Sequence, residues 1–133
     1  MSQENVETFR RVVAGFNRGG DPQGEELFDP EVRIEPLLAG GVEGVVYRGR
    51  AGAVEFVSQL NEIFAEVHAD YSRIEEFDDI LLVSGKTTGR GRTGGVPVEQ
   101  PWFCAVRFRQ GKIVYAAFRG TRAEALEAAG LSE

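Results

Sequence analysis

Few side chains in this sequence have the chemistry to act on a substrate, and Glu35 is the foremost of them. It ends a segment in which Val32 and Ile34 alternate with polar residues. A carboxylate that points into an apolar cavity loses hydration, which raises its pKa towards the range of a general base. We therefore predict that Glu35 is the catalytic base. The alternative is that Glu35 shares the polar face of its strand with Glu31 and Arg33, where it is solvated or ion-paired.

The single cysteine and the single histidine are weaker candidates for chemistry. Cys104 would need a base and a positive environment to become a thiolate. Free cysteines usually pack as small buried hydrophobic groups, so we interpret Cys104 as structural. His68 is interpreted as a residue of the surface or of a helix boundary. These counts exclude an internal disulfide, a cysteine zinc site and a histidine cluster, and we expect no metal and no cofactor.

The charge balance argues against nucleic acid as a partner. The chain carries 15 Lys and Arg against 21 Asp and Glu, a net charge of -6, whereas nucleic-acid affinity comes mostly from neutralised phosphates. Arg90 and Arg92 lie among glycines in a predicted hairpin loop. Two arginines in such a turn could bind an anion, but in an acidic chain we interpret the segment as a mobile loop.

Length and composition indicate one domain over residues 1–133. The chain is 42% hydrophobic and 27% charged, which is ordinary for a globular protein. No apolar run approaches the roughly 18 residues that a membrane span needs, and the polar N-terminus does not resemble a signal peptide. We therefore expect a cytoplasmic protein with no membrane contact.

Hydrophobic periodicity predicts helices in the first half of the chain and strands in the second. The spacing predicts a helix over 4–18, a short helix ending near 27–28, a strand from 31, and a long helix from 49–52 to 67. Strands are predicted over 70–77, 80–83, 96–109 and 112–119, followed by a short helix that Thr121 caps. This order predicts an α+β fold with helices gathered on one face of a sheet.

One face of the 96–109 strand is apolar and should point towards the helices. Its chemistry is limited to Gln100, the Trp102 indole and Cys104. Together with aromatic residues of the helices, these side chains either line a cavity for an apolar or aromatic molecule or fill the core. The predicted lining residues are Phe16, Tyr47, Phe56, Leu60, Phe64, Gln100, Trp102 and Cys104.

The opposite face of the last strands is also rich in apolar residues. They are Phe103, Ala105, Ile113, Tyr115 and Ala117. No predicted helix covers this face, and exposed patches of this kind usually mark a partner surface. We therefore expect a two-fold homodimer through it.

Several short strings follow one another in an order that resembles a known family. They are Asn5-Val6-Glu7-Thr8-Phe9, Leu27-Phe28-Asp29-Pro30, Tyr47-Arg48-Gly49-Arg50 and Phe108-Arg109-Gln110-Gly111-Lys112. Together they resemble the SnoaL-like branch of the nuclear transport factor 2-like superfamily. The resemblance implies a curved antiparallel sheet that forms a cone, closed by three helices from the N-terminal half, with a short C-terminal helix. Relatives include polyketide cyclases, ketosteroid isomerases, epoxide hydrolases, dehydratases and proteins that only bind or dimerise.

Carried over residue by residue, the ketosteroid isomerase pattern matches only in part. Its general-base aspartate corresponds to Glu35, whereas its two hydrogen-bond donors correspond to Val12 and Cys104. The resemblance implies a small-molecule-binding protein with cofactor-free isomerase, cyclase or lyase chemistry on an apolar carbonyl compound. Glu35 would remove a proton alpha to the carbonyl, and Gln100 or Trp102 would steady the oxygen. The alternative is a non-catalytic ligand-binding or homodimerisation module.

Overall fold

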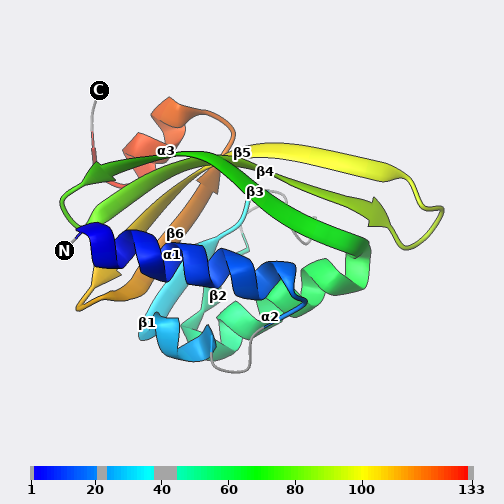
Figure 1. Cartoon of the computed structure of the whole chain (residues 1–133), viewed down its shortest axis with the longest axis horizontal. Coiled ribbons are helices and arrows are strands. Elements are labelled where there is room, and N and C mark those ends of the chain that lie inside the picture. Colours follow the sequence, from blue (N-terminus) through cyan, green and yellow to red (C-terminus); the bar gives the residue numbers. More distant parts are fainter. Residues whose placement is uncertain (1, 21–23, 38–44, 132–133) are drawn as a thin grey trace.

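The computed structural model describes residues 2–20, 24–37 and 45–131. Helices α1 (Ser2–Asn17) and α2 (Gly49–Ile63) lie on the inner face of a curved sheet, and α3 (Arg122–Ala128) lies on its outer face (Figure 1). A short 3-10 helix, η1, spans Gly24–Leu27. The strands are β1 (Phe28–Glu35), β2 (Tyr47–Arg48), β3 (Phe64–Phe77), β4 (Ile80–Gly91), β5 (Pro97–Arg109) and β6 (Lys112–Arg119).

The six strands form one open sheet in the order β2-β1-β6-β5-β4-β3. Strands β3 to β6 make an antiparallel meander, whereas β1 pairs with β6 in parallel. The sheet is therefore mixed, where an entirely antiparallel one was predicted. The parallel pair arises because the chain passes through β2, α2 and strands β3 to β5 before β6 returns beside β1. In the described part of the chain, no helix combines the length and hydrophobicity that crossing a bilayer requires.

The prediction that the second long helix reaches residue 67 is wrong. Helix α2 ends at Ile63, and β3 begins at Phe64 with a register irregularity near Glu66, which has a φ of 56°. Phe64 and Val67 continue the helical spacing by coincidence, because both still face the same interior from β3. His68 lies within this strand at the surface, where its Nε2 is 3.2 Å from an Asp70 carboxylate oxygen.

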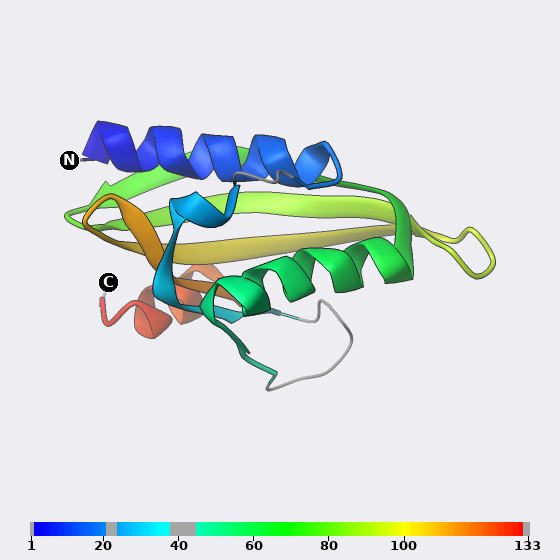
Figure 2. The ribbon, with the colours of Figure 1, turned by 90° about the horizontal axis from the view of Figure 1, so that it is seen from below.

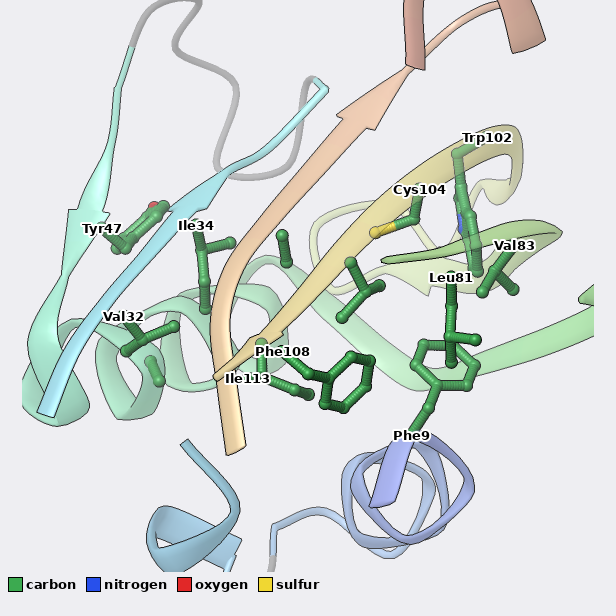
Figure 3. Packing of buried hydrophobic residues seen from close by; sticks show 13 residues of the cluster. Phe9, Val32, Ile34, Tyr47, Leu81, Val83, Trp102, Cys104, Phe108 and Ile113 are labelled. Atoms are coloured by element: carbon green, nitrogen blue, oxygen red, sulfur yellow. The ribbon is translucent and has the colours of Figure 1, made fainter. Parts of the chain in front are cut away.

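Alternation along the strands separates two apolar clusters. The inner cluster joins the sheet to α1 and α2, and Figure 2 shows both helices running along that face. Its buried members include Phe9, Val32, Ile34, Leu81, Val83, Cys104, Val106 and Phe108 (Figure 3). The outer cluster joins the sheet to α3 through Ile80, Leu82, Ala105, Ala125, Leu126 and Ala129. Thr121 caps α3 as predicted, because its side chain accepts a hydrogen bond from the Glu124 N–H.

The predicted parity of β6 fails at a bulge. Phe108 is paired with Ile113, but the preceding residue Arg107 is paired with Tyr115, so Val114 is an extra residue in the strand. Ile113 therefore faces inward and is buried in the inner cluster, which corrects its predicted place on the outer face. Figure 3 shows Phe108 and Ile113 on the side of the sheet where α1 lies.

The outer face is also less exposed than predicted. Ala105 lies in the cluster beneath α3, and Ala117 is fully buried within the single chain. Of the predicted dimer residues, Phe103 and Tyr115 alone keep partial exposure. The expectation that no helix covers this face is wrong, because α3 lies across part of it.

Two contacts position α1 and the Trp102 ring on the inner face of the sheet. The Asn17 side chain donates to the Ala69 carbonyl at 2.9 Å and accepts from the Ala69 N–H at 2.8 Å, which fastens the end of α1 to β3. Gly85 pairs with Trp102 across β4 and β5. A Cβ at Gly85 would lie 2.4 Å from the Asp70 carbonyl oxygen and 2.6 Å from the indole ring, so the ring occupies the space that a side chain would take.

Replacing Gly85 with alanine should destabilise the fold and disturb the indole. Because the clash involves backbone as well as ring, we expect the free energy of unfolding to fall by about 1–3 kcal/mol. Urea denaturation measures the loss, and the emission of Trp102, the sole tryptophan, should shift.

Gly89→Ala is the matched control on the same strand. A Cβ at Gly89 meets nothing closer than 3.4 Å, which is ordinary contact. If both variants lose the same stability, the indole does not lie over Gly85.

Candidate functional site

A cavity of about 1150 Å³ lies between the inner face of the sheet and helices α1 and α2. The structure places seven of the eight predicted lining residues around it: Phe16, Phe56, Leu60, Phe64, Gln100, Trp102 and Cys104. They come from α1, α2, β3 and β5, so the cavity depends on the whole inner arrangement. Further lining residues that the sequence did not single out include Val12, Val57, Thr87 and Phe118.

Tyr47, the eighth predicted residue, lies behind the Phe56 ring and is not among the described lining residues. It is only 5% exposed, and its ring packs against Phe56 with centroids 5.3 Å apart. Its hydroxyl donates to the Gln59 side chain. Tyr47 therefore supports the Phe56 ring from outside the cavity.

Aromatic rings form a continuous row along one wall. The Phe56 and Phe118 centroids are 6.1 Å apart, and the Trp102 ring meets Phe118 edge-on at 5.3 Å. Contacts of this geometry are favourable beyond the area they bury. The row gives the cavity an aromatic wall in which successive rings are tilted against one another. The sequence signal for Phe118 is regular alternation in β6, which places it on the inner face because the adjacent Ala117 lies on the outer one.

Neutral polar groups of the lining gather around the Trp102 indole. The indole Nε1 donates to the Thr87 Oγ1 at 2.9 Å. Thr87 is paired across the strands with Gln100, whose amide Nε2 donates to the Pro101 carbonyl at 3.0 Å. The sequence signal for Thr87 is the run Gly85-Lys86-Thr87-Thr88-Gly89, which puts small residues on one face opposite Trp102.

Charge lies at the rim of the cavity and not inside it. The charged side chains among the described lining residues are Arg11, Glu25 and Glu62, and all three are exposed. Cys104 is 1% exposed, and burial raises the pKa of its thiol, so the sulfur is protonated and neutral. A thiol in this setting is a poor nucleophile, in keeping with the structural interpretation.

Glu35 lies on the outer face of the sheet and is not among the described lining residues. Its carboxylate accepts hydrogen bonds from the Tyr115 hydroxyl at 2.9 Å and from Arg119 at 2.5 Å. Arg33 Nε is 3.3 Å away. Partial burial would raise the pKa of Glu35, but the hydrogen bonds and the two cations outweigh it and hold the pKa below its usual value. The alternation of Val32 and Ile34 inward with Glu35 outward is the arrangement that the alternative interpretation described.

The two arginines of the glycine-rich hairpin both contact protein groups. Arg92 Nε donates to the Asn61 carbonyl at 2.7 Å, and Arg90 Nε is 3.5 Å from a Glu66 carboxylate oxygen. The hairpin is thereby tied to the end of α2. No group of three or more potential metal-ligating side chains occurs in the described ranges.

Comparison with known proteins identifies a family. A model of the SnoaL-like domain matches residues 9–116. No curated protein matches the chain.

Solved structures show the same fold at low identity. IdmH, a candidate polyketide cyclase from Streptomyces antibioticus, is 22% identical, with 96% of this chain and 99% of that chain covered and a TM-score of 0.73. TerC, co-crystallised with polyporic acid, is 20% identical over 93% and 98%, with a TM-score of 0.76. A protein of ketosteroid isomerase-like fold from Catenulispora acidiphila, in complex with trimethylamine, is 16% identical over 94% and 93%, with a TM-score of 0.72.

These neighbours confirm the predicted α+β fold of a curved sheet covered by helices. Because the family model spans most of the domain, this chain belongs to the SnoaL-like domain family.

Proposed function

We propose that this protein binds a small, apolar, ring-containing molecule in the cavity between α1, α2 and the sheet. The observation that carries the proposal is a cavity of about 1150 Å³ with an aromatic wall and with its charged lining residues confined to the rim. Ligand sites in proteins are typically concave, mostly apolar and supplied with a few placed polar groups. A charged ligand would lose hydration in this interior without gaining a counter-charge.

The neighbours support the proposal by what they hold. TerC was crystallised with polyporic acid, and the Catenulispora acidiphila protein with trimethylamine. A fold that accommodates small molecules in those proteins offers this chain the same kind of space. Function on a shared fold is nevertheless decided by the lining residues.

Catalysis through Glu35 stays a prediction, and the contacts of Glu35 favour the non-catalytic alternative. A carboxylate held by Arg119 and Tyr115 remains ionised, and a lowered pKa makes it a weaker base. We therefore assign the binding role to the cavity residues and leave Glu35 out of it. The cytoplasmic location and the lack of a cofactor also remain predictions.

Binding is tested with fluorene, a planar hydrocarbon that carries no polar group. We expect it to shift the single indole N–H resonance of Trp102 in a nitrogen–proton correlation spectrum and to raise the melting temperature. Val57→Phe puts extra volume into the cavity from α2 and should weaken binding at least about fivefold, equivalent to about 1 kcal/mol.

Ala51→Phe adds the same ring to an exposed position of α2 and should leave the affinity unchanged. If fluorene fails to bind, or if both variants weaken binding equally, the cavity is not a ligand site.

The ion pair of Glu35 should make a pH-dependent contribution to stability. Folding lowers the pKa of Glu35, so the folded chain binds this proton more weakly than the unfolded chain. The contribution is therefore complete above the ordinary pKa of 4.5 and is lost as the pH falls through the lower value of the folded chain. We expect Glu35→Gln to cost about 1–2 kcal/mol at pH 7, with the difference from wild type shrinking below pH 4.5.

Urea denaturation from pH 7 to pH 3 measures this difference, with Glu127→Gln at an exposed site of α3 as the control. Glu35→Gln also tests whether this carboxylate meets the cavity, as the catalytic hypothesis requires. Glu35→Gln should leave fluorene binding unchanged, and a change of more than about threefold would place the carboxylate in contact with the cavity.

The homodimer remains a second proposal, now resting on a smaller surface. Phe103 and Tyr115 keep partial exposure on the outer face, and the Arg33 guanidinium stacks 4.6 Å from the centre of the Tyr115 ring. Aromatic and arginine side chains of this kind are enriched in protein interfaces.

Sedimentation velocity should give twice the chain mass of 14.6 kDa at micromolar concentration. Phe103→Glu should shift the mass towards the single chain, since it puts a charge into the proposed contact. A wild-type chain that sediments at 14.6 kDa over the whole concentration range excludes the dimer.

A further inference from the structure

The hydrogen bond between Trp102 and Thr87 leaves one proton of the cavity without a partner. The indole N–H occupies a lone pair of the Thr87 Oγ1 at 2.9 Å. A threonine hydroxyl accepts with its oxygen and donates with its own hydrogen. Within the described parts of the chain, no group accepts that hydrogen, while Thr87 itself lines the cavity.

The indole also fixes the direction of the hydroxyl. Trp102 is 6% exposed, and its ring is held between Gly85 and Phe118. Because the indole approaches the Thr87 oxygen from one side, the hydroxyl hydrogen has to turn away from it. Thr87 is therefore a neutral donor whose acceptor must come from whatever occupies the cavity.

Gln100 is the polar side chain that pairs with Thr87 across the strands, and it is less available as a donor. One of its amide hydrogens is used by the Pro101 carbonyl at 3.0 Å. The aromatic row of Phe56, Phe118 and Trp102 continues from the Thr87 position. A flat ring lying along that row would carry its oxygen to Thr87.

We infer that the Thr87 hydroxyl, held by the Trp102 indole, donates a hydrogen bond to a carbonyl oxygen of a planar aromatic ligand. This inference rests on the proposed binding function and names the ligand class as neutral aromatic ketones. It also makes Thr87 the residue that distinguishes such ketones from hydrocarbons of the same shape.

The test compares 9-fluorenone with fluorene, two tricyclic molecules of nearly the same shape that differ in the carbonyl group. Titrations followed at the Trp102 indole resonance give both dissociation constants for each variant. Thr87→Val keeps the shape of the side chain and removes the hydroxyl. We expect it to weaken fluorenone binding about three- to tenfold, as for loss of one neutral hydrogen bond, and to change fluorene binding less than about twofold.

Thr87→Ser is the control that keeps both the donor and the acceptor, and it should retain the preference for fluorenone. A second measurement reports the hydrogen bond itself. The infrared carbonyl stretch of bound fluorenone should lie at lower frequency in the wild type and in Thr87→Ser than in Thr87→Val. A purely structural role for Thr87 would leave that frequency unchanged.

The outcomes separate the two proposals. If the wild type binds fluorene, but Thr87→Val affects both molecules equally or neither, the cavity is a ligand site and the role of Thr87 is overturned. If the wild type binds neither molecule, the binding function fails and this inference fails with it.

Discussion

A buried indole N–H has to find an acceptor, and in this protein that requirement ties the packing of the sheet to the chemistry of the cavity. The Trp102 ring fits only because Gly85 lacks a side chain, and it reaches its acceptor only because Thr87 follows two residues later on the same face. With the ring in this place, Phe118 meets it edge-on, and Phe56 extends the row towards Tyr47. The position of the aromatic wall thus follows from the hydrogen bond that the Trp102 N–H makes with Thr87.

Desolvation explains why the charged groups lie elsewhere. An ionised side chain inside the cavity would lose its hydration, so the described ion pairs of the sheet lie on its outer face and at its edges. Arg109 joins Asp29 at 2.8 Å and links β5 to the start of β1, and Arg122 joins Glu75 at 2.7 Å and links α3 to β3. Arg119 and Glu35 do the same for β6 and β1. These ion pairs link the strands to one another and α3 to β3, and the side chains deep in the cavity are neutral.

Periodicity was sufficient to predict most elements, but it missed the second half of β4, which continues to Gly91, and two places where the backbone is irregular. The bounds of β6 and the Thr121 cap follow directly from alternation and capping chemistry. The end of α2 does not, because Phe64 keeps a helical spacing after the backbone has become extended. The inward place of Ile113 depends on the bulge at Val114, which no composition signal marks.

The sequence likewise predicted most lining residues of the candidate site but not its hydrogen-bond contacts. The aromatic lining follows from strand and helix faces, since burial and lining select the same residue types. Thr87 could not be found in that way, because its importance comes from a partner 15 positions away across a strand pair. Glu35 left two orientations open, and the choice between them depended on which face Arg119 and Tyr115 occupy.

A curved sheet offers a reason why relatives of this fold can differ in chemistry while keeping the same space. Val12 and Cys104, where the family resemblance predicts the positions of hydrogen-bond donors, both line the cavity without supplying a strong donor. Inward residues of several neighbouring strands converge on one interior, so a donor lost from β5 can be replaced from β4. Thr87 occupies such a position, and the indole that orients it comes from the strand that carries Cys104. The cavity therefore has one directed, neutral donor at Thr87, although Val12 and Cys104 supply none of comparable strength.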